Sequence, residues 1–211
     1  MKREGAAKPQ LRRKPQQARA SARRGRFLEV AAQLIAQSGY DAVTMTAIAE
    51  NAQASIGTLY DYFPDKPALA LALLARYTEE ADAHWKALLT PARLRSKAVL
   101  ADVFIEGILD FVRQRPAYLA LLDAPIAYAR TKSARRPLRR TIARAFKRLH
   151  PEMPAKQAVL VAEIIVTLIK SFLAVYRRAA ARDRAQVEAE FRRLLRLYLV
   201  DQFKATPIRK H

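Results

Sequence analysis

The chain has 211 residues, of which 51% are hydrophobic, and this composition excludes global disorder. It has no cysteine and only three scattered histidines, which excludes disulfides, thiolate or histidine metal sites and a cysteine nucleophile. There are 39 lysines and arginines against 19 acids, and the net charge is +20. Glycine is scarce, and alanine, leucine and arginine, which favour helices, dominate the composition. We therefore expect an all-α fold.

No segment is expected to enter a membrane. The longest apolar run, residues 164–169, is far shorter than the ~18 residues that a membrane span needs. The basic N-terminus is not followed by an apolar stretch, so it does not have the pattern of a secretory signal. We therefore expect a soluble, cytoplasmic protein.

Residues 1–21 are predicted to be a basic, largely disordered N-terminal arm. Ten lysines and arginines and a single acid, Glu4, lie between Met1 and Arg26, and Pro9 and Pro15 interrupt the first part of this segment. The arm can act as a solubilising extension or can contact phosphates, and we favour phosphate contact.

Apolar residues from Phe27 to Ile35 recur at steps of three and four, which predicts a helix. Gly39 is suited to the left-handed backbone conformation that commonly ends such a helix. Thr44 is expected to cap a second, short helix, and Ser55 is expected to cap a third that ends before residue 64. A fourth helix follows, capped by the side chain at position 65.

Two short helices that follow a packing helix are typical of a helix-turn-helix, which we place at about residues 44–63. The surrounding domain is expected to span residues 22–82, and a larger helical domain is expected to span residues 83–211. Similar helical corners also occur in proteins that bind no nucleic acid. The arrangement of helices alone therefore does not distinguish a DNA-binding protein from these other proteins.

The segment AAQLIAQSGYDAVTMTAIAENAQASIGTLYDYFPDKPALALALL resembles the DNA-binding region of TetR-type (TetR/AcrR) bacterial transcriptional regulators. The resemblance covers roughly residues 22–77, and the spacing of the family's motifs is kept throughout. One departure is Pro67, where an acidic residue is common. The motif residues are Gly39 and Tyr40, Thr44 to Ala49, Ser55, Gly57, Leu59, Tyr60, Tyr62, Phe63 and Lys66.

No lysine or arginine lies between Phe27 and Phe63, so the predicted recognition helix must contact DNA without cationic side chains. Helix N-termini bind phosphates through backbone N–H groups, and hydroxyl groups supply further donors. We expect Leu59 to point inward and Tyr60 outward. The predicted phosphate contacts are Thr44, Thr46, Ser55, Thr58, Tyr60, Tyr62 and Lys66, with Gly57 allowing close approach, and the predicted base contacts are Gln53, Ala54, Ser55, Ile56 and Thr58.

Prolines divide the second half of the chain into helical lengths, and the last two helices carry wide apolar surfaces. The resemblance implies that these two helices pair with their copies in a homodimer; burial on all sides within one chain is the alternative. The expected helices are 93–115, 117–123, 126–133, 138–149, 155–181 and 184–203. The expected interface residues are Val159, Ala162, Val166, Ile169, Leu173, Tyr176, Phe191, Leu194, Leu195 and Tyr198.

The resemblance also implies a pocket for a small-molecule effector in the second domain, although each candidate also fits an ordinary core position. Asp123 and Glu163 are polar residues in apolar surroundings. The basic run 130–148 fits a solvated face, a second phosphate-binding surface or an entrance that attracts an anionic effector. The expected lining is Phe104, Ile108, Phe111, Tyr118, Leu122, Asp123, Tyr128 and Phe172.

These observations predict a homodimeric, sequence-specific DNA-binding regulator, a repressor that a small-molecule effector releases from a palindromic operator. No cofactor, metal or membrane is expected. An enzyme is disfavoured because no nucleophile–base pair, glycine-rich phosphate loop or metal spacing is present. The alternative is a basic nucleic-acid compaction protein with little sequence preference.

Overall fold

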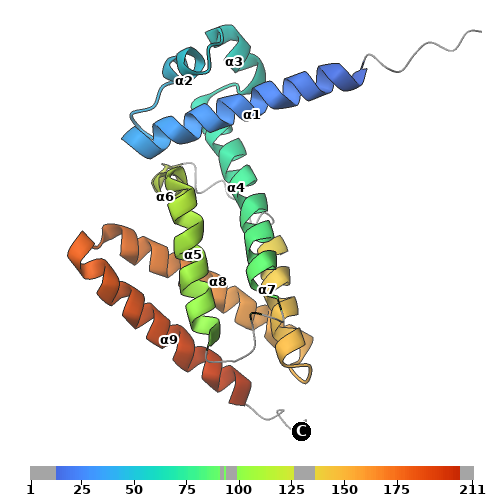
Figure 1. Cartoon of the computed structure of the whole chain (residues 1–211), viewed down its shortest axis with the longest axis vertical. Coiled ribbons are helices and arrows are strands. Elements are labelled where there is room, and N and C mark those ends of the chain that lie inside the picture. Colours follow the sequence, from blue (N-terminus) through green and yellow to red (C-terminus); the bar gives the residue numbers. More distant parts are fainter. Residues whose placement is uncertain (1–12, 91–92, 94–98, 126–135, 205–211) are drawn as a thin grey trace, which may run out of the picture. The chain divides into compact units, whose positions relative to one another are not determined.

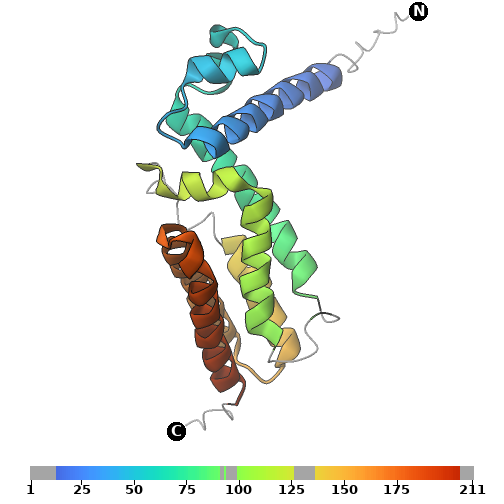
Figure 2. The same cartoon turned by 60° about the vertical axis from the view of Figure 1, so that its left-hand side comes forward.

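The computed structural model describes residues 13–90, 93, 99–125 and 136–204, and throughout these ranges the regular structure is helical. The chain divides into two compact units, residues 1–73 and 74–211. Figures 1 and 2 show the helices in two views. The units are described separately below, and α4 (Lys66–Leu88) contributes to both.

The first unit consists of α1 (Arg13–Ser38), α2 (Met45–Asn51), α3 (Ile56–Tyr62) and the start of α4. The predicted caps are confirmed: Gly39 closes α1 at a φ of 82°, and Thr44 and Ser55 accept hydrogen bonds at the starts of α2 and α3. Asp65 accepts from the amide of Ala68 at the start of α4. Local sequence therefore determines where α1 ends and where α2, α3 and α4 begin.

The helix-turn-helix is held by a small apolar core. Phe27 and Ile35 of α1 are buried, as are Ile48 of α2, Leu59 of α3 and Leu69 of α4. Each helix thus presents one apolar face to the others, and its remaining side chains are available at the surface.

The basic arm was expected to be largely disordered through residue 21, but the structure is helical from Arg13 onward. Pro15 does not prevent this, because it falls in the first turn of α1, where a backbone N–H has no intrahelical partner. The arginines that follow, at positions 19 and 23, are exposed along this helix. Residues 1–12 lie outside the described residues.

The second unit contains the rest of α4 and α5 (Leu100–Gln114), α6 (Pro116–Asp123), α7 (Arg136–Leu149), α8 (Ala155–Arg178), η5 (Ala181–Asp183) and α9 (Arg184–Lys204). Helix α7 packs along α8, and α5 packs along α9 (Figures 1 and 2). Helices were predicted over 93–115 and 155–181. Instead Arg93 lies in a turn and α5 begins at Leu100, while α8 ends at Arg178, before η5. The helix expected at 126–133 lies outside the described residues.

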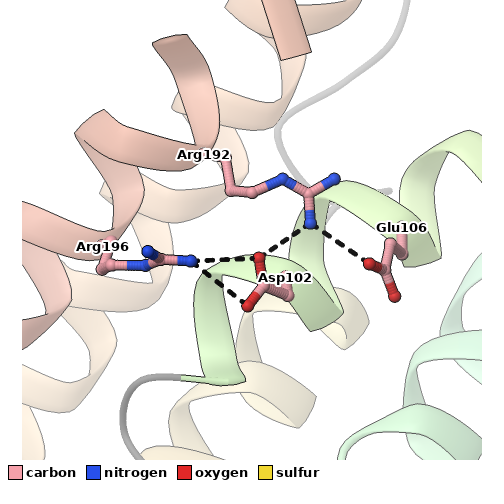
Figure 3. A network of polar contacts seen from close by, with 4 residues as sticks. All are labelled: Asp102, Glu106, Arg192 and Arg196. Carbon is pink, nitrogen blue, oxygen red and sulfur yellow. Dashed lines mark hydrogen bonds and ion pairs between the residues drawn. The ribbon is translucent and has the colours of Figure 1, made fainter. Parts of the chain in front are cut away.

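Four charged side chains connect α5 to α9 (Figure 3). Arg192 donates to Asp102 at 2.7 Å and to Glu106 at 3.2 Å, and Arg196 donates to both carboxylate oxygens of Asp102 at 3.4 Å. The hydrogen bond to Asp102 raises the pKa of Arg192 above its ordinary value. Because the two arginines lie one helical turn apart, they fix the register between α5 and α9.

Helix α8 qualifies the sequence-based expectation about membranes. It is the one candidate span within the described residues, with a mean hydropathy of 2.3, and 44% of the candidate window is buried inside the chain. Its buried side chains pack against α7 and α9, so the apolar composition reflects core packing on one face. The exposed remainder of α8 is considered below.

Helix α7 separates its charges from its apolar side chains. Ile142 and Phe146 are buried, whereas Arg140, Arg144 and Arg148 are exposed on the opposite face. This arrangement explains much of the basic run 130–148 as the outer face of an amphipathic helix. Residues 130–135 of that run lie outside the described ranges.

Candidate nucleic-acid interface and ligand cavity

The third helix presents one side to the core and one to solvent, as predicted. Leu59 is 0% exposed, whereas Tyr60 is 50% exposed and Ile56 is 39% exposed. Ser55 accepts a hydrogen bond from the amide of Thr58 at 3.1 Å and begins the helix. The outer face of α3 therefore offers a methyl-bearing side chain and a phenol hydroxyl at its surface.

The hydroxyls at the start of α3 also contact each other. Ser55 Oγ and Thr58 Oγ1 are 2.8 Å apart, so one of the two hydroxyls donates to the other. The second hydroxyl hydrogen remains available for a phosphate or base acceptor. Thr44 plays a related part at α2, where its Oγ1 accepts from Ala47 at 3.1 Å and leaves the hydroxyl hydrogen available.

The turn between α2 and α3 includes an unusual backbone conformation. Gln53 has a φ of 56°, in the left-handed region that residues other than glycine rarely adopt. Hydrogen bonds from Gln53 N to Glu50 O and from Ala54 N to Ala49 O, each 3.0 Å, hold the turn. The exposed Gln53 side chain is thereby fixed directly before α3, a constraint that no sequence signal at this position indicated.

Lys66 is held within the first unit. Its ammonium group donates to the backbone carbonyls of Tyr40, Asp41 and Val43 at 2.9–3.2 Å, and it lies 4.5 Å from the ring centroid of Tyr40. This lysine therefore ties the start of α4 to the loop before α2. Its predicted contact with phosphate stays a prediction.

Helix α1 brings cationic side chains beside the ends of α2 and α3, which contain no lysine or arginine. The guanidinium of Arg24 lies 5.3 Å from the ring centroid of Phe63, and Arg26 Nε donates to Ala52 O at 3.0 Å. The ring of Tyr62 packs 5.7 Å from that of Phe27. The sequence analysis counted these arginines among the basic residues of the N-terminal segment and assigned them no contact with the helix-turn-helix.

The structure places the predicted DNA-binding residues on α2, α3, their turns and the start of α4, and it leaves most of them accessible. Their contacts with DNA stay predictions. Thr44, Thr46, Gln53, Ser55, Ile56, Gly57 and Tyr60 are exposed, while Ala54, Thr58, Tyr62 and Lys66 are half-buried.

A cavity of about 420 Å³ lies within the second unit, among helices α4 to α8. This volume is within the range of small-molecule sites. Trp85, the single tryptophan of the chain, contributes to the wall. The lining residues are Thr78, Ala81, Trp85, Ile108, Phe111, Tyr118, Leu122, Leu138, Val166, Ile169, Lys170, Leu173, Ala174, Arg177 and Arg178.

Half of the predicted pocket lining is found in this wall, namely Ile108, Phe111, Tyr118 and Leu122. Phe104 and Phe172 do not line it. Phe104 is fully buried between the rings of Trp85 and Phe146, and Phe172 packs against Tyr176 and Phe191.

The polar residues expected near the pocket are placed differently. Glu163 forms an ion pair with Arg139 and is absent from the lining. The side chain of Asp123 and the whole of Tyr128 lie outside the described residues. The sequence analysis did not include Lys170, Arg177 and Arg178 of α8 in the expected lining.

A glycine that does not line the cavity packs against Trp85 of its wall. Gly107 of α5 lies so close to α4 that an added Cβ would be 2.7 Å from Leu88 Cδ1 and 3.0 Å from the Trp85 ring. His84 Nε2 lies 2.8 Å from the Gly107 carbonyl oxygen and completes this contact. Only a residue without a side chain allows α4 and α5 to approach so closely.

An apolar surface remains exposed on α8 and α9. Leu160 and Val175 of α8 are 59% and 44% exposed, and Leu194 and Leu197 of α9 are 45% and 66% exposed. We call these four residues, with the 53% exposed Val159, the α8–α9 apolar face.

This face corrects the predicted dimer interface. Five of the residues assigned to it are buried inside their own chain and are not on the surface, because the apolar periodicity of α8 and α9 identified the inward face as well as the outward one. Val159 and Leu194 are exposed, and Tyr176, Phe191 and Tyr198 are half-buried. The buried five are Ala162, Val166, Ile169, Leu173 and Leu195.

Comparison with known proteins supports the first unit most directly. Residues 27–73 match the sequence model of "Bacterial regulatory proteins, tetR family", and residues 98–199 match "Tetracyclin repressor-like, C-terminal domain". The HTH-type transcriptional repressor KstR of Rhodococcus jostii is 45% identical over 64 residues, and its namesake in Mycobacterium tuberculosis is 41% identical over 61 residues. These matches span only 30% and 28% of the two relatives' lengths.

Solved structures show the same fold over most of the chain. A TetR-family transcriptional regulator from Pectobacterium atrosepticum superposes with a TM-score of 0.71 at 19% identity, covering 86% of this chain and 94% of the other. Salmonella enterica GusR gives 0.62 at 21% identity, covering 87% and 96%. Since the two family models together match more than two thirds of the sequence, the chain belongs to the tetR family of bacterial regulatory proteins.

Proposed function

We propose that this chain is a homodimeric transcriptional repressor that binds a palindromic DNA operator and is released by a small molecule. The observation that carries the proposal is the outer face of α3, where Ile56 and Tyr60 are exposed while Leu59 anchors the helix. In a helix-turn-helix the second helix enters the major groove and contacts base edges. Family membership supports the same role.

Affinity and specificity come from different parts of the first unit. The arginines of α1, with Arg24 and Arg26 packed beside the helix-turn-helix, contact phosphates and draw the protein to any duplex. Gln53, Ser55 and Ile56 contact bases through a side-chain amide, a hydroxyl and a methyl group. The protein acts on DNA in the cytoplasm.

The second unit supplies dimerisation and release. The α8–α9 apolar face pairs with its copy in a second chain, so that two α3 helices meet two half-sites. The cavity of about 420 Å³ holds the effector. Effector binding favours a conformation with lower affinity for the operator.

The experiment is a selection of bound duplexes from random DNA, followed by titration of the selected and scrambled duplexes at several salt concentrations. We expect a palindrome bound at least about a thousandfold more tightly than its scrambled counterpart. A protein that binds every duplex equally, with affinity that falls steeply with salt, would be a compaction protein and would contradict the proposal.

A further inference from the structure

The turn after α2 has a hydrogen-bond pattern that usually places glycine at its centre. The amide of Ala54 donates to Ala49 O and the amide of Gln53 donates to Glu50 O, each at 3.0 Å. These two bonds define a Schellman motif, in which the residue after the helix cap adopts the left-handed conformation and is most often glycine. In this chain that residue is Gln53, at a φ of 56°.

The other end of this kind in the first unit has the usual residue. Gly39 closes α1 at a φ of 82°, and its amide donates to Ile35 O at 2.9 Å. Among the described residues other than glycine, Gln53 is the one with a positive φ. In the left-handed conformation a Cβ crowds its own backbone, a cost that glycine does not have. Gln53 therefore lowers the stability of the turn relative to glycine.

No contact within the described residues compensates for this cost. The Gln53 side chain is exposed, and its amide makes no hydrogen bond to the part of the chain that the structure describes. The neighbouring Asn51 differs, because its amide donates to Ala47 O at 2.8 Å. Strained backbone that is not required by packing is found mainly at functional sites. We therefore look for the partner of this side chain outside the chain.

The place of Gln53 in the helix-turn-helix indicates what that partner is. Gln53 lies two residues before Ser55, the cap of α3, and the N-terminal end of such a helix meets base edges in the major groove. A glutamine amide has a donor and an acceptor side by side, which match N7 and the N6 amino group of adenine. A phosphate accepts hydrogen bonds only and would use only the donor.

We infer that Gln53 is a specificity-determining residue, whose amide contacts one adenine in each half-site while the left-handed turn holds it at the start of α3. The inference rests on the proposed function in that the helix-turn-helix binds an operator. It goes further by assigning one base to one residue and by linking that assignment to a loss of stability.

The experiment substitutes the operator one base pair at a time. The duplex selected with the parent protein is changed at every position of one half-site, and fluorescence anisotropy measures the affinity of the full chain for each duplex. At one position we expect the parent protein to prefer an A·T pair at least about tenfold over any other pair.

Two variants separate the side chain from the backbone. Gln53→Ala removes the amide but keeps a Cβ in the left-handed conformation, whereas Gln53→Gly removes both. Each variant is expected to bind all base pairs at that position within about twofold and to keep the preferences of the parent protein elsewhere. The urea midpoint of Gln53→Gly should exceed that of Gln53→Ala by at least about 0.3 M. Equal midpoints would overturn the loss of stability on which the inference rests.

Gln37→Ala is the matched control, because Gln37 is an exposed glutamine of α1 that lies outside the turn. An unchanged preference in Gln53→Ala, or an equal loss of affinity for every duplex, would overturn the inference and leave the proposed function intact. A loss confined to Gln53→Gly, a preference for another base pair at the affected position, or an equal effect in the control would also overturn it. A parent protein that binds every duplex equally would contradict the proposed function itself.

Discussion

Adjacent residues on α3 have opposite environments, and this difference assigns their roles. Leu59 is fully buried and holds the helix to α2, whereas the ring of Tyr60 is half exposed. Replacing Leu59 would change the folding of the unit, while replacing Tyr60 changes only the surface that we propose contacts DNA. A variant at Tyr60 can therefore test the proposed DNA interface without also disrupting the fold of the unit.

Tyr60→Phe is expected to lower operator affinity about five- to tenfold, because the variant has no hydroxyl to donate to a phosphate. Fluorescence anisotropy with the selected duplex measures the change, and circular dichroism checks the helix content. Tyr176→Phe, which removes the same hydroxyl on α8, is the matched control. Equal affinities for Tyr60→Phe and the parent protein would show that the hydroxyl does not touch DNA.

Glu80 of α4 accepts a hydrogen bond from Arg115, and its protonation is expected to lower the free energy of unfolding. Although burial raises its pKa, the hydrogen bonds and charges of Arg115 and Arg76 together hold the pKa of Glu80 below its ordinary value of 4.5. Because the folded-state pKa is lowered, this contribution is complete above the unfolded value and is lost as the pH falls through the folded value.

Glu80→Gln is therefore expected to lower the free energy of unfolding by about 1–3 kcal/mol at neutral pH, since it weakens the partner of the half-buried Arg115. The difference from the parent protein should begin to shrink below about pH 4.5 and should be lost as the pH falls through the lower pKa that Glu80 has in the folded chain. Urea unfolding at a series of pH values measures this trend. A difference that does not change with pH would mean that the ionised carboxylate contributes nothing.

The bounds of the N-terminal helices were largely predictable from the sequence, whereas the packing of the C-terminal helices was not. Thr44 and Ser55 are local signals, because a cap depends on residues only two or three positions away. The inward face of α8 depends on which partner helices cover it, and residues such as Ile169 and Leu160 are equally apolar. The cavity combines residues from α4 to α8, so no short stretch of sequence could specify it.

The continuous helix from Arg13 changes how the N-terminal segment should be tested. Removing residues 1–12 deletes Lys2, Arg3, Lys8 and Arg12 and leaves α1 whole. We expect affinity for operator and scrambled duplexes to fall by the same factor. The slope of log affinity against log salt should become shallower by roughly 0.9 for each phosphate that the shortened protein no longer neutralises.

Affinity measured on both duplexes at several salt concentrations provides the comparison. The equal factor follows because phosphate contacts carry no base information. If the preference for the operator collapsed while the salt slope stayed constant, these residues would read sequence, as basic arms in narrow minor grooves do.

At the level of the whole molecule, the proposed function makes DNA recognition depend on the pairing of two chains. In a single chain, the exposed leucines of α8 and α9 are in contact with water, which is energetically unfavourable. Pairing of this surface would link two half-site contacts into one binding event. The affinity for a full palindrome is therefore a sensitive measure of dimerisation.

Leu197→Glu and Leu160→Glu are each expected to shift the protein to monomers and to reduce palindrome affinity at least about a hundredfold. Val99→Glu is the control, because Val99 is also an exposed apolar residue, at 41%, but lies outside α8 and α9. Sedimentation velocity measures the oligomeric state. A dimer that persists in both leucine variants would place the interface on another surface.

Gly107 does not line the cavity, but it lies close to Trp85, which does. Alanine at this position meets the flexible end of Leu88, which can move, and the rigid ring of Trp85, which can only be displaced as a whole. Since Trp85 forms part of the cavity wall, a methyl group added at position 107 would shift this ring and change the shape of the cavity. In related chains, an exchange of glycine for alanine at this position would alter which molecules fit the proposed effector site, although every residue that lines the cavity stayed the same.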